Sequence, residues 1–456
     1  MFSFHHGCSP IRGIAGLFIL GLLLGTLLAE DEGRWPQFRG ADARGVAADS
    51  DRLPDQWSTT KNVVWSEAIE GRGWSSPIVW GDRVFLTTVV NDGETEPVKK
   101  GLYFGGNRSE PPKSNHRWKA ICLSLSTGEK LWDRTLHEGV PPTSMHLKNS
   151  YASETPVTDG KQLYCYFGNV GLFCLTMDGE LIWTHEVEPH KTRFDWGTAS
   201  SPVVYEDRLI FVNDNEEDSY LIALDTQTGN PIWRVEREEK SNWATPYVWQ
   251  NEQRTEIVTP GTGKIRSYDL DGNLLYELGG CSSITIANPY AENGLLYVTS
   301  GYVLDKKKPI FAIRPGASGD ISLEADQTSN EFIAWCQLQA APYNPSTLLY
   351  EGLIYVLYDR GFLACYDAVT GEEIYGKQRI PKGRAFTASP WAYNGKIFCL
   401  NEDGKTFVMK AGPEFEILGT NELEEGELCM ATPAIANDRL LIRTADRLYC
   451  LQQQDQ

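Results

Sequence analysis

A short motif, in which a small polar residue precedes proline, recurs along the whole chain and constrains the fold more than any other feature. The eight copies are Ser76-Pro77, Thr155-Pro156, Ser201-Pro202, Thr245-Pro246, Asn288-Pro289, Asn344-Pro345, Ser389-Pro390 and Thr432-Pro433. Their prolines are 43 to 46 residues apart, except for gaps of 79 and 56 residues after the first and fifth copies. A period of this length is typical of one four-stranded blade of a β-propeller. Eight copies therefore predict eight blades, with extra residues in the first and fifth units.

Each unit also contains a turn followed by a strand. The turn pairs, which come shortly after most of the prolines, are Gly81-Asp82, Asp159-Gly160, Glu206-Asp207, Asn293-Gly294, Glu351-Gly352, Asn394-Gly395 and Asn437-Asp438. Runs rich in branched and aromatic residues follow them, such as 209–212 and 353–356. This order predicts hairpin tips that lead into short buried strands.

A second motif closes several units. The third unit ends in Ala223–Trp233, and this segment resembles the tryptophan-docking motif of pyrroloquinoline-quinone (PQQ)-type propellers. Glycine permits the positive φ of the turn, aspartate or threonine can bind turn amides, and the terminal aromatic supplies apolar surface between neighbouring blades. Across the units, the residues assigned to this structural motif are Trp132, Trp183, Asp225, Gly229, Trp233, Tyr276, Asp367, Gly371 and Tyr375. The resemblance spans about residues 35–451 and implies a fold more strongly than a function.

The first and last strands of the repeat region are expected to pair with each other. The eighth unit ends at Leu448–Leu451 without an outer strand, and Asn62–Trp65 has the pattern of an outer strand without a blade. Pairing of the two closes the ring and removes exposed sheet edges. We therefore expect an all-β protein over residues 62–451, an eight-bladed β-propeller of four-stranded antiparallel blades. An N-terminal extension at 30–61 precedes it and a tail at 452–456 follows it.

The first 29 residues have the pattern of a secretion signal. Arg12 precedes an apolar run over 14–28 that ends at Ala29, and a retained membrane anchor is the alternative. Without residues 1–29 the chain keeps 41 basic against 61 acidic side chains. Such a surface repels phosphate backbones, so nucleic-acid binding is disfavoured. We expect an exported protein, periplasmic or extracellular, with no stable membrane span after cleavage.

Nine cysteines remain after the signal, an odd number for an exported protein. Cys122, Cys174, Cys365 and Cys450 occupy the same motif position in different units. Because the ring holds equivalent positions of separate blades apart, we expect buried structural thiols at these positions and no disulfides among them.

Residues just before the repeated prolines are the candidates for a ligand site at the mouth of the central channel. Their aromatic rings can form a stacking platform or can pack between blades. Nearby carboxylates and an amide offer oxygen ligands of the kind that calcium prefers, but none carries a specific motif, so no metal site and no catalytic residue is assigned. The candidate ligand-binding residues are Trp74, Asn149, Tyr151, Glu154, Asp195, Trp196, Trp243, Tyr343 and Phe386.

An insertion at about 91–117 is the most individual segment of the chain. It is rich in glycine, proline and charge and contains Tyr103. Long excursions from a rigid ring commonly carry recognition, and a flexible spacer is the alternative. The segment 146–149, just before the second blade, is another candidate part of the rim.

The resemblance implies two functions from different classes. One branch of these propellers is non-enzymatic and presents loops of a rigid ring to protein partners in the cell envelope. The other contains PQQ- and calcium-dependent dehydrogenases, which use a catalytic aspartate and usually an adjacent Cys-Cys pair. This chain has no adjacent Cys-Cys pair and no Cys-x-x-Cys-His haem motif. We therefore expect a non-enzymatic binding or scaffolding module, with an envelope protein or a glycan as ligand. The alternative is a divergent dehydrogenase of alcohols or sugars that needs PQQ and calcium.

Overall fold

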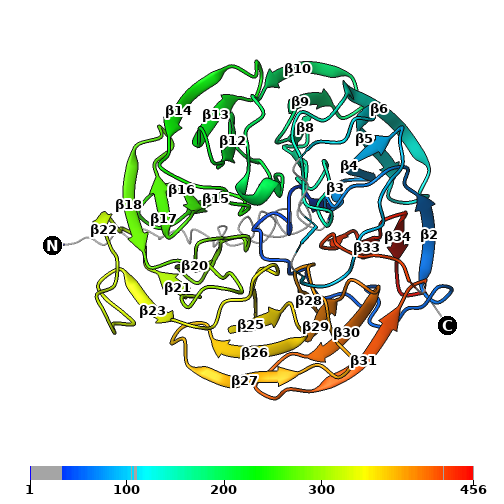
Figure 1. The fold of residues 1–456 in the computed structure, drawn as a ribbon. Coiled ribbons are helices and arrows are strands. Elements are labelled where there is room, and N and C mark those ends of the chain that lie inside the picture. The colour runs from blue at the N-terminus through cyan, green and yellow to red at the C-terminus, as the bar shows by residue number, and fades with distance from the viewer. Residues whose placement is uncertain (2–32, 104, 107–109, 425, 455–456) are drawn as a thin grey trace.

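The computed structural model of the protein describes all residues except 2–32, 104, 107–109, 425 and 455–456. Its strands form eight sheets that surround a central axis as blades (Figure 1). The expected eight-bladed β-propeller is therefore confirmed. The expected signal peptide, apart from Met1, lies outside the described residues.

Within most blades the innermost strand comes first and the chain then moves outward. Blade 1 contains β3 (Ile78–Trp80), β4 (Arg83–Asn91), β5 (His116–Ser124) and β6 (Lys130–Gly139). Blade 2 contains β7 (Val157–Thr158), β8 (Gln162–Phe167), β9 (Gly171–Thr176) and β10 (Leu181–Glu186). A 3-10 helix, η1 (Arg193–Asp195), precedes blade 3. Blade 3 contains β11 (Val203–Tyr205), β12 (Arg208–Asn213), β13 (Tyr220–Asp225) and β14 (Pro231–Glu236). Blade 4 contains β15 (Tyr247–Gln250), β16 (Thr255–Pro260), β17 (Lys264–Tyr268) and β18 (Leu274–Gly279).

The second half of the ring repeats this order. Blade 5 contains β19 (Tyr290–Glu292), β20 (Leu295–Thr299), β21 (Ile310–Ile313) and β23 (Ile333–Gln337). Blade 6 contains β24 (Leu348–Tyr350), β25 (Leu353–Tyr358), β26 (Phe362–Asp367) and β27 (Glu373–Arg379). Blade 7 contains β28 (Trp391–Tyr393), β29 (Lys396–Leu400), β30 (Lys405–Lys410) and β31 (Ile417–Glu422). Blade 8 contains β32 (Ala434–Ala436), β33 (Arg439–Arg443), β34 (Arg447–Leu451) and β2 (Val63–Ala68).

The ring closes as expected, because the N-terminal strand completes the last blade. Strand β2 runs antiparallel to β34, with Val63 opposite Leu451 and Trp65 opposite Cys450. Figure 1 shows the blue β2 outside the red β34. The strand begins one residue later than the expected 62–65 and continues to Ala68. The pairing satisfies the outer edge of blade 8, which the chain otherwise leaves open.

Two sheets differ from the expected four strands. In blade 1, β1 (Arg34–Trp35) pairs with β3 on the channel side. In blade 4, β22 (Gly319–Asp320) adds a parallel strand outside β18. The N-terminal extension and the extra residues of the fifth unit thus supply backbone partners to sheet edges, which a count of repeats cannot show.

The position of a strand in its blade explains its residue types. A middle strand such as β4 is buried along almost its whole length, because a neighbouring blade covers each face of the sheet. An outer strand such as β14 alternates between exposed and less exposed residues. Continuous apolar runs therefore mark the middle of each blade and alternating runs mark its rim.

Aromatic residues on the outer strands connect consecutive blades. In each case an indole N–H donates to a main-chain oxygen in the turn before the outer strand of the next blade; the pairs are Trp65 to Leu125, Trp132 to Met177, Trp183 to Thr226, Trp233 to Leu270 and Trp335 to Ala368. The turn itself is shaped by Asp225, whose Oδ1 accepts the N–H groups of Gln227 and Thr228, and by Gly229 with a φ of 72°. The same contact thus recurs around the ring and fixes the angle between blades.

Candidate functional site

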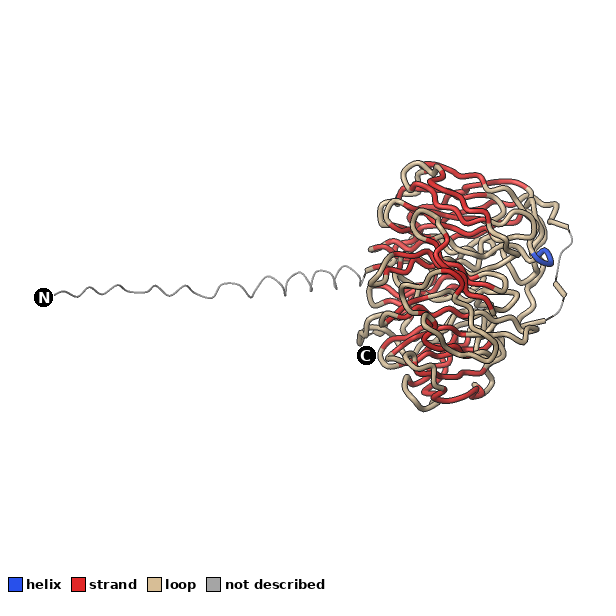
Figure 2. The backbone as a smooth tube through the Cα atoms, turned by 90° about the vertical axis from the view of Figure 1, so that its left-hand side faces the viewer, coloured by secondary structure: helices blue, strands red, loops and turns tan. Residues whose placement is uncertain are grey.

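A cavity of about 580 Å³ lies at one mouth of the central channel. Residues from the connections that enter all eight inner strands contribute to its lining, together with 101–103 and Gly105 of the insertion. The insertion itself occupies 92–115, between β4 and β5. Figure 2 shows η1 on this face of the ring, opposite the C-terminal end of the chain. Because the lining comes from every blade, the site depends on closure of the ring.

Aromatic side chains form the wall of the cavity. The ring centroids of Trp196 and Trp243 are 5.7 Å apart, and those of Tyr302 and Tyr343 are 5.2 Å apart. The indole Nε1 of Trp243 donates to the Gly197 oxygen at 2.7 Å. With its N–H engaged in this way, Trp243 offers the cavity an apolar ring surface rather than a hydrogen-bond donor.

A belt of hydroxyl groups lines the deeper part of the cavity. The belt consists of Thr155, Ser201, Thr245, Ser346, Ser389 and Thr432. Each hydroxyl oxygen accepts the backbone N–H of the equivalent residue in the preceding blade, over distances of 2.9 to 3.1 Å. The small polar residue before the repeated proline therefore joins consecutive blades around the channel.

The structure corrects the expected position of the repeated motif in blade 6. In blade 6 the residue that joins it is Ser346, and Thr347 stands where the other blades have proline. The expected copy at Asn344-Pro345 lies two residues earlier, since β24 begins only at Leu348. A proline can precede an inner strand at more than one position, whereas the belt needs its hydroxyl at one position.

The insertion forms a roof over part of the cavity. The Gly101 N–H donates to Glu402 Oε2 at 2.7 Å, and Lys148 Nζ lies 2.5 Å from Glu402 Oε1 and 3.1 Å from the Gly101 oxygen. Lys100 also pairs with Asp403 at 3.1 Å. These contacts connect the insertion of blade 1 to the β29–β30 turn of blade 7, across the mouth of the ring.

The N-terminal extension closes the opposite end of the channel. It begins with β1 against blade 1, and Val46 then forms a bridge to Ala392 in β28 of blade 7. Figure 1 shows this dark blue segment near the centre of the ring. Phe38 of this segment lines both the cavity at the mouth and a second cavity of about 730 Å³ at the other face. Phe38 therefore lies between the cavity at the mouth and the cavity at the other face.

The described lining of the cavity contains no aspartate and no glutamate. The Asn149 amide is fully engaged, because its Nδ2 donates to the Trp196 and Thr198 oxygens and its Oδ1 accepts from Ser150 and Ser153. Calcium prefers several carboxylate or carbonyl oxygens. The described lining of the cavity therefore does not fit the calcium ion that the resemblance to PQQ enzymes implies.

Five of the nine candidate residues from the sequence line this cavity: Trp74, Asn149, Trp196, Trp243 and Tyr343. The other four do not. Tyr151 packs against Trp118 and donates its hydroxyl to the Thr143 oxygen, and Phe386 packs against Phe407. Asp195 lies in η1, beside the cavity.

Glu154, the fourth, is a buried carboxyl group beneath the wall. Its Oε1 accepts the Thr198 hydroxyl at 2.5 Å and the Gly168 N–H at 3.2 Å. Burial raises the pKa of Glu154 to about 7, although these hydrogen bonds act to lower it. The residue is 1% exposed and its described hydrogen bonds come from neutral groups, so it holds a proton more readily than an ordinary glutamate.

Sequence reasoning did not assign the belt hydroxyls, Tyr302 or Phe38 to the site. The belt residues could have been found from the sequence, because they belong to the repeated motif. The motif predicts the number of blades, however, and does not by itself indicate that its hydroxyl groups line a cavity. Tyr302 and Phe38 lie outside the repeated motifs, and only the fold brings them to the channel.

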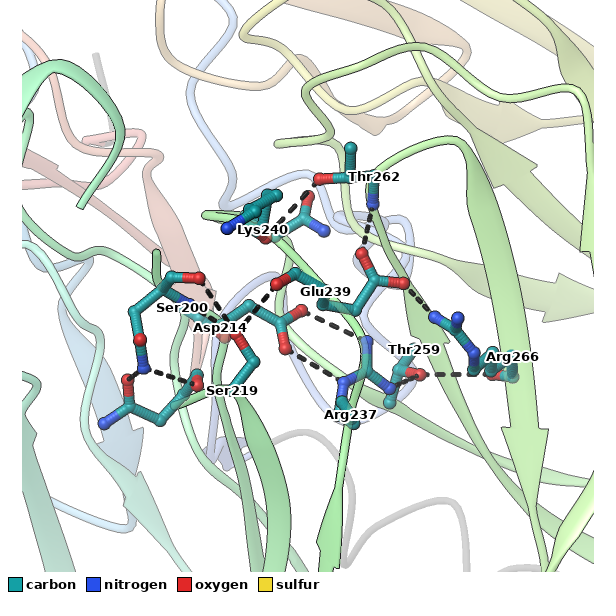
Figure 3. A network of polar contacts seen from close by, with 12 residues as sticks. Ser200, Asp214, Ser219, Arg237, Glu239, Lys240, Thr259, Thr262 and Arg266 are labelled. Atoms are coloured by element: carbon teal, nitrogen blue, oxygen red, sulfur yellow. Dashed lines mark hydrogen bonds and ion pairs between the residues drawn. The ribbon is translucent and has the colours of Figure 1, made fainter. Parts of the chain in front are cut away.

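A second polar cluster joins blades 3 and 4 away from the cavity. Arg237 forms a bidentate pair with Asp214 at 2.9 and 3.1 Å, and both side chains are completely buried (Figure 3). Its Nη1 also donates to Thr259 Oγ1 at 2.6 Å. Each of the three guanidinium nitrogens donates to a partner inside the protein, as in a structural ion pair.

All nine described cysteines are free and buried. Burial raises the pKa of the Cys122 and Cys336 thiols to about 12. Such thiols are poor nucleophiles, because the thiolate is the reactive form. Two further findings concern the described part of the chain. It contains no group of three or more His, Cys, Asp or Glu residues arranged to hold a metal ion. It also contains no helix long and apolar enough to cross a membrane.

A family model described as outer membrane protein assembly factor BamB matches residues 119–374, which is more than half of the chain. No curated protein sequence matches. Among solved structures, BamB from Moraxella catarrhalis is 12% identical with a TM-score of 0.57, and the match covers 86% of this chain and 99% of that one.

Two dehydrogenases have a similar fold. The quinohemoprotein alcohol dehydrogenase from Comamonas testosteroni is 11% identical with a TM-score of 0.61, over 95% of this chain and 82% of that one. A europium-containing methanol dehydrogenase is 10% identical with a TM-score of 0.59, over 93% of this chain and 99% of that one. The expected resemblance to PQQ-type propellers is therefore confirmed, and identities this low establish the fold alone.

Proposed function

The chain belongs to the family of the outer membrane protein assembly factor BamB, and on that premise we propose that it is a non-enzymatic binding module of the cell envelope. The observation that carries the proposal is the composition of the channel-mouth cavity, whose described lining has aromatic rings and hydroxyl groups but no carboxylate. The resemblance to quinone-dependent dehydrogenases implies a catalytic carboxylate and a metal ion with oxygen ligands at this place. The site supplies binding surface without the groups for that chemistry.

The architecture supports a scaffolding role. Aromatic contacts between blades and closure by β2 make the ring a rigid support. The insertion crosses the mouth and adds an individual surface on one face. Recognition commonly resides in such excursions from a rigid scaffold. We place the partner-binding surface on this face and the protein outside the cytoplasm, in agreement with the signal expected at residues 1–29.

The enzymatic alternative is tested by titrating the purified mature protein with PQQ and calcium while tryptophan fluorescence is recorded. We expect no saturable quenching. Saturable quenching at micromolar PQQ, weakened by Trp243→Ala, would overturn the proposal and favour a dehydrogenase, since Trp243 forms part of the cavity wall. Circular dichroism of the variant is the control for its fold.

The scaffolding role is tested by site-specific photo-crosslinking in cells. A photoreactive residue is placed at Lys113 in the insertion, and a matched one at Glu351 in the turn between β24 and β25; both positions are exposed. We expect a discrete crosslinked protein from position 113 and none from position 351. Absence of any adduct at 113, with the protein correctly exported, would contradict a partner-binding surface on this face.

A further inference from the structure

The belt hydroxyls have unused hydrogen-bonding capacity that faces the cavity. Each of the six oxygens accepts a backbone N–H, yet within the described residues none of the six O–H groups has an acceptor. All six residues are more than nine-tenths buried. A hydroxyl that already accepts a hydrogen bond is a stronger donor, because hydrogen-bond chains polarise one another. The deep part of the cavity is therefore a set of converging donors without charge.

The wall requires a ligand with apolar faces. Trp243 and Trp74 both have their indole N–H groups engaged, with the Gly197 and Lys148 oxygens. What they and Tyr302 offer is flat apolar surface. A fully apolar ligand would leave the belt hydroxyls without partners, which costs free energy for each buried donor. The ligand must combine acceptor groups with apolar faces.

The charged groups at the cavity narrow the class of ligand further. Lys148 lines the cavity but is paired with Glu402, whose side chain is only 1% exposed. The chain as a whole carries a formal charge of −19, so an anion gains no long-range attraction. Arg360 also lines the cavity, but its side chain is exposed to solvent, so the buried belt hydroxyls favour a neutral ligand.

We propose that this cavity binds the end of a neutral saccharide. A pyranose ring has C–H faces that pack against aromatic rings, and its edge carries oxygens that accept hydrogen bonds. A volume of about 580 Å³ is within the usual range for small-ligand sites. The inference goes beyond the proposed function and rests on its conclusion that the cavity is not catalytic.

A groove next to the cavity indicates where the rest of the saccharide would lie. The groove has a volume of about 280 Å³ and lies over blades 5 and 6, and it shares Leu102, Tyr302, Val303, Tyr343 and Arg360 with the cavity. Leu304, at the rim of the cavity, is 60% exposed. Leu102 of the roof lines both the cavity and the groove, so a terminal sugar in the cavity places the next unit in the groove.

The test is isothermal titration of the purified mature protein with cellobiose, maltose and N,N′-diacetylchitobiose. We expect saturable binding of at least one disaccharide, with a dissociation constant of about 1 mM or below. Thr432→Val removes one belt hydroxyl and is expected to weaken binding roughly threefold to tenfold, as the loss of one neutral hydrogen bond does. Tyr302→Ala removes part of the wall without touching the belt and is expected to weaken binding as well.

Thr406→Val is the matched control, because Thr406 is fully buried in β30, away from the cavity, and its hydroxyl has no partner. We expect unchanged affinity in this variant. The inference is overturned if none of the three disaccharides binds, if neither Thr432→Val nor Tyr302→Ala weakens binding, or if sodium sulfate competes for the site. Failure to bind saccharide without PQQ binding overturns this inference alone, whereas PQQ binding overturns the proposed function too.

Discussion

The indole N–H of Trp183 in blade 2 donates to the Thr226 oxygen of blade 3 at 3.0 Å, and its ring covers Gly229 so closely that a Cβ there would lie 2.5 Å from the indole. Gly229 itself has a φ of 72°, which its turn requires. One glycine thus meets two requirements, the conformation of its own turn and the approach of the neighbouring blade.

Gly229→Ala is expected to lower the free energy of unfolding by about 2 to 4 kcal/mol, because it adds backbone strain and a clash with Trp183. Gly263→Ala is the control, since Gly263 has a φ of 75° but no atom within 4 Å of a Cβ. We expect a loss of only about 1 to 2 kcal/mol there. Urea unfolding followed by tryptophan fluorescence measures both, and equal losses would contradict the docking role.

The buried pair of Arg237 and Asp214 is expected to behave as one unit. Removing one partner, as in Asp214→Leu or Arg237→Met, leaves a buried polar group without its counterpart and is expected to cost about 3 to 5 kcal/mol. The double variant Asp214→Leu/Arg237→Met is expected to lose less than the sum of the single losses. Urea midpoints measure the cycle, and simple additivity would show that the pair does not couple.

Glu154 is expected to make stability depend on pH. Its pKa in the folded protein is about 7 against an ordinary 4.5, so the folded state binds more protons between these values. Stability contributed by the protonated group is therefore complete below pH 4.5 and is lost as the pH rises through 7, by about 3 kcal/mol. Glu154→Gln is expected to remove this loss.

Thermal unfolding of both proteins from pH 4 to pH 8 measures the effect. The advantage of Glu154→Gln is expected to appear above pH 5 and to level off above pH 7. Glu180→Gln, at an exposed glutamate, serves as the control and is expected to follow the parent protein at every pH. Parallel curves for Glu154→Gln and the parent protein would show that this carboxyl group titrates normally.

The roof over the cavity is expected to depend on Glu402. This carboxylate accepts from Gly101 of the insertion and pairs with Lys148, so Glu402→Ala releases the roof and leaves a largely buried cation. We expect tryptic cleavage within 92–115 to accelerate about tenfold or more, through local opening. Glu422→Ala, at a half-exposed pair with Lys405, is expected to leave the rate unchanged. An unchanged rate in Glu402→Ala would show that other contacts hold the roof.

Much of this fold could be predicted from the sequence, because the motifs that specify it are short and recur in every blade. The turn pair Asn394-Gly395 has positive φ at both residues, as a tight hairpin requires, and Trp65 occupies the outer strand that closes the ring. The copy at Asn344-Pro345 was misplaced by two residues, since a proline marks the approach to a strand less strictly than the belt hydroxyl of Ser346 does. The strands β1 and β22 were missed because short pairings to a sheet edge leave no pattern in composition.

Only part of the candidate site could be predicted from the sequence. Residues before the prolines were expected near the channel, and Trp243 does line the cavity, whereas Tyr151 turns into the packing between blades. Which of two neighbouring aromatic residues faces the channel depends on the course of each connection, and periodicity does not encode that course.

The sequence by itself determined the number of blades, their order and the way the ring closes, because each follows from a motif that repeats at a fixed spacing or from complementary ends. Only the tertiary structure decided the site. Its wall, belt and roof come from segments as far apart as Phe38 and Thr432, and their approach depends on closure of the whole ring. Local patterns specify a repeating unit, whereas a cavity shared by eight units exists only when all of them are in place.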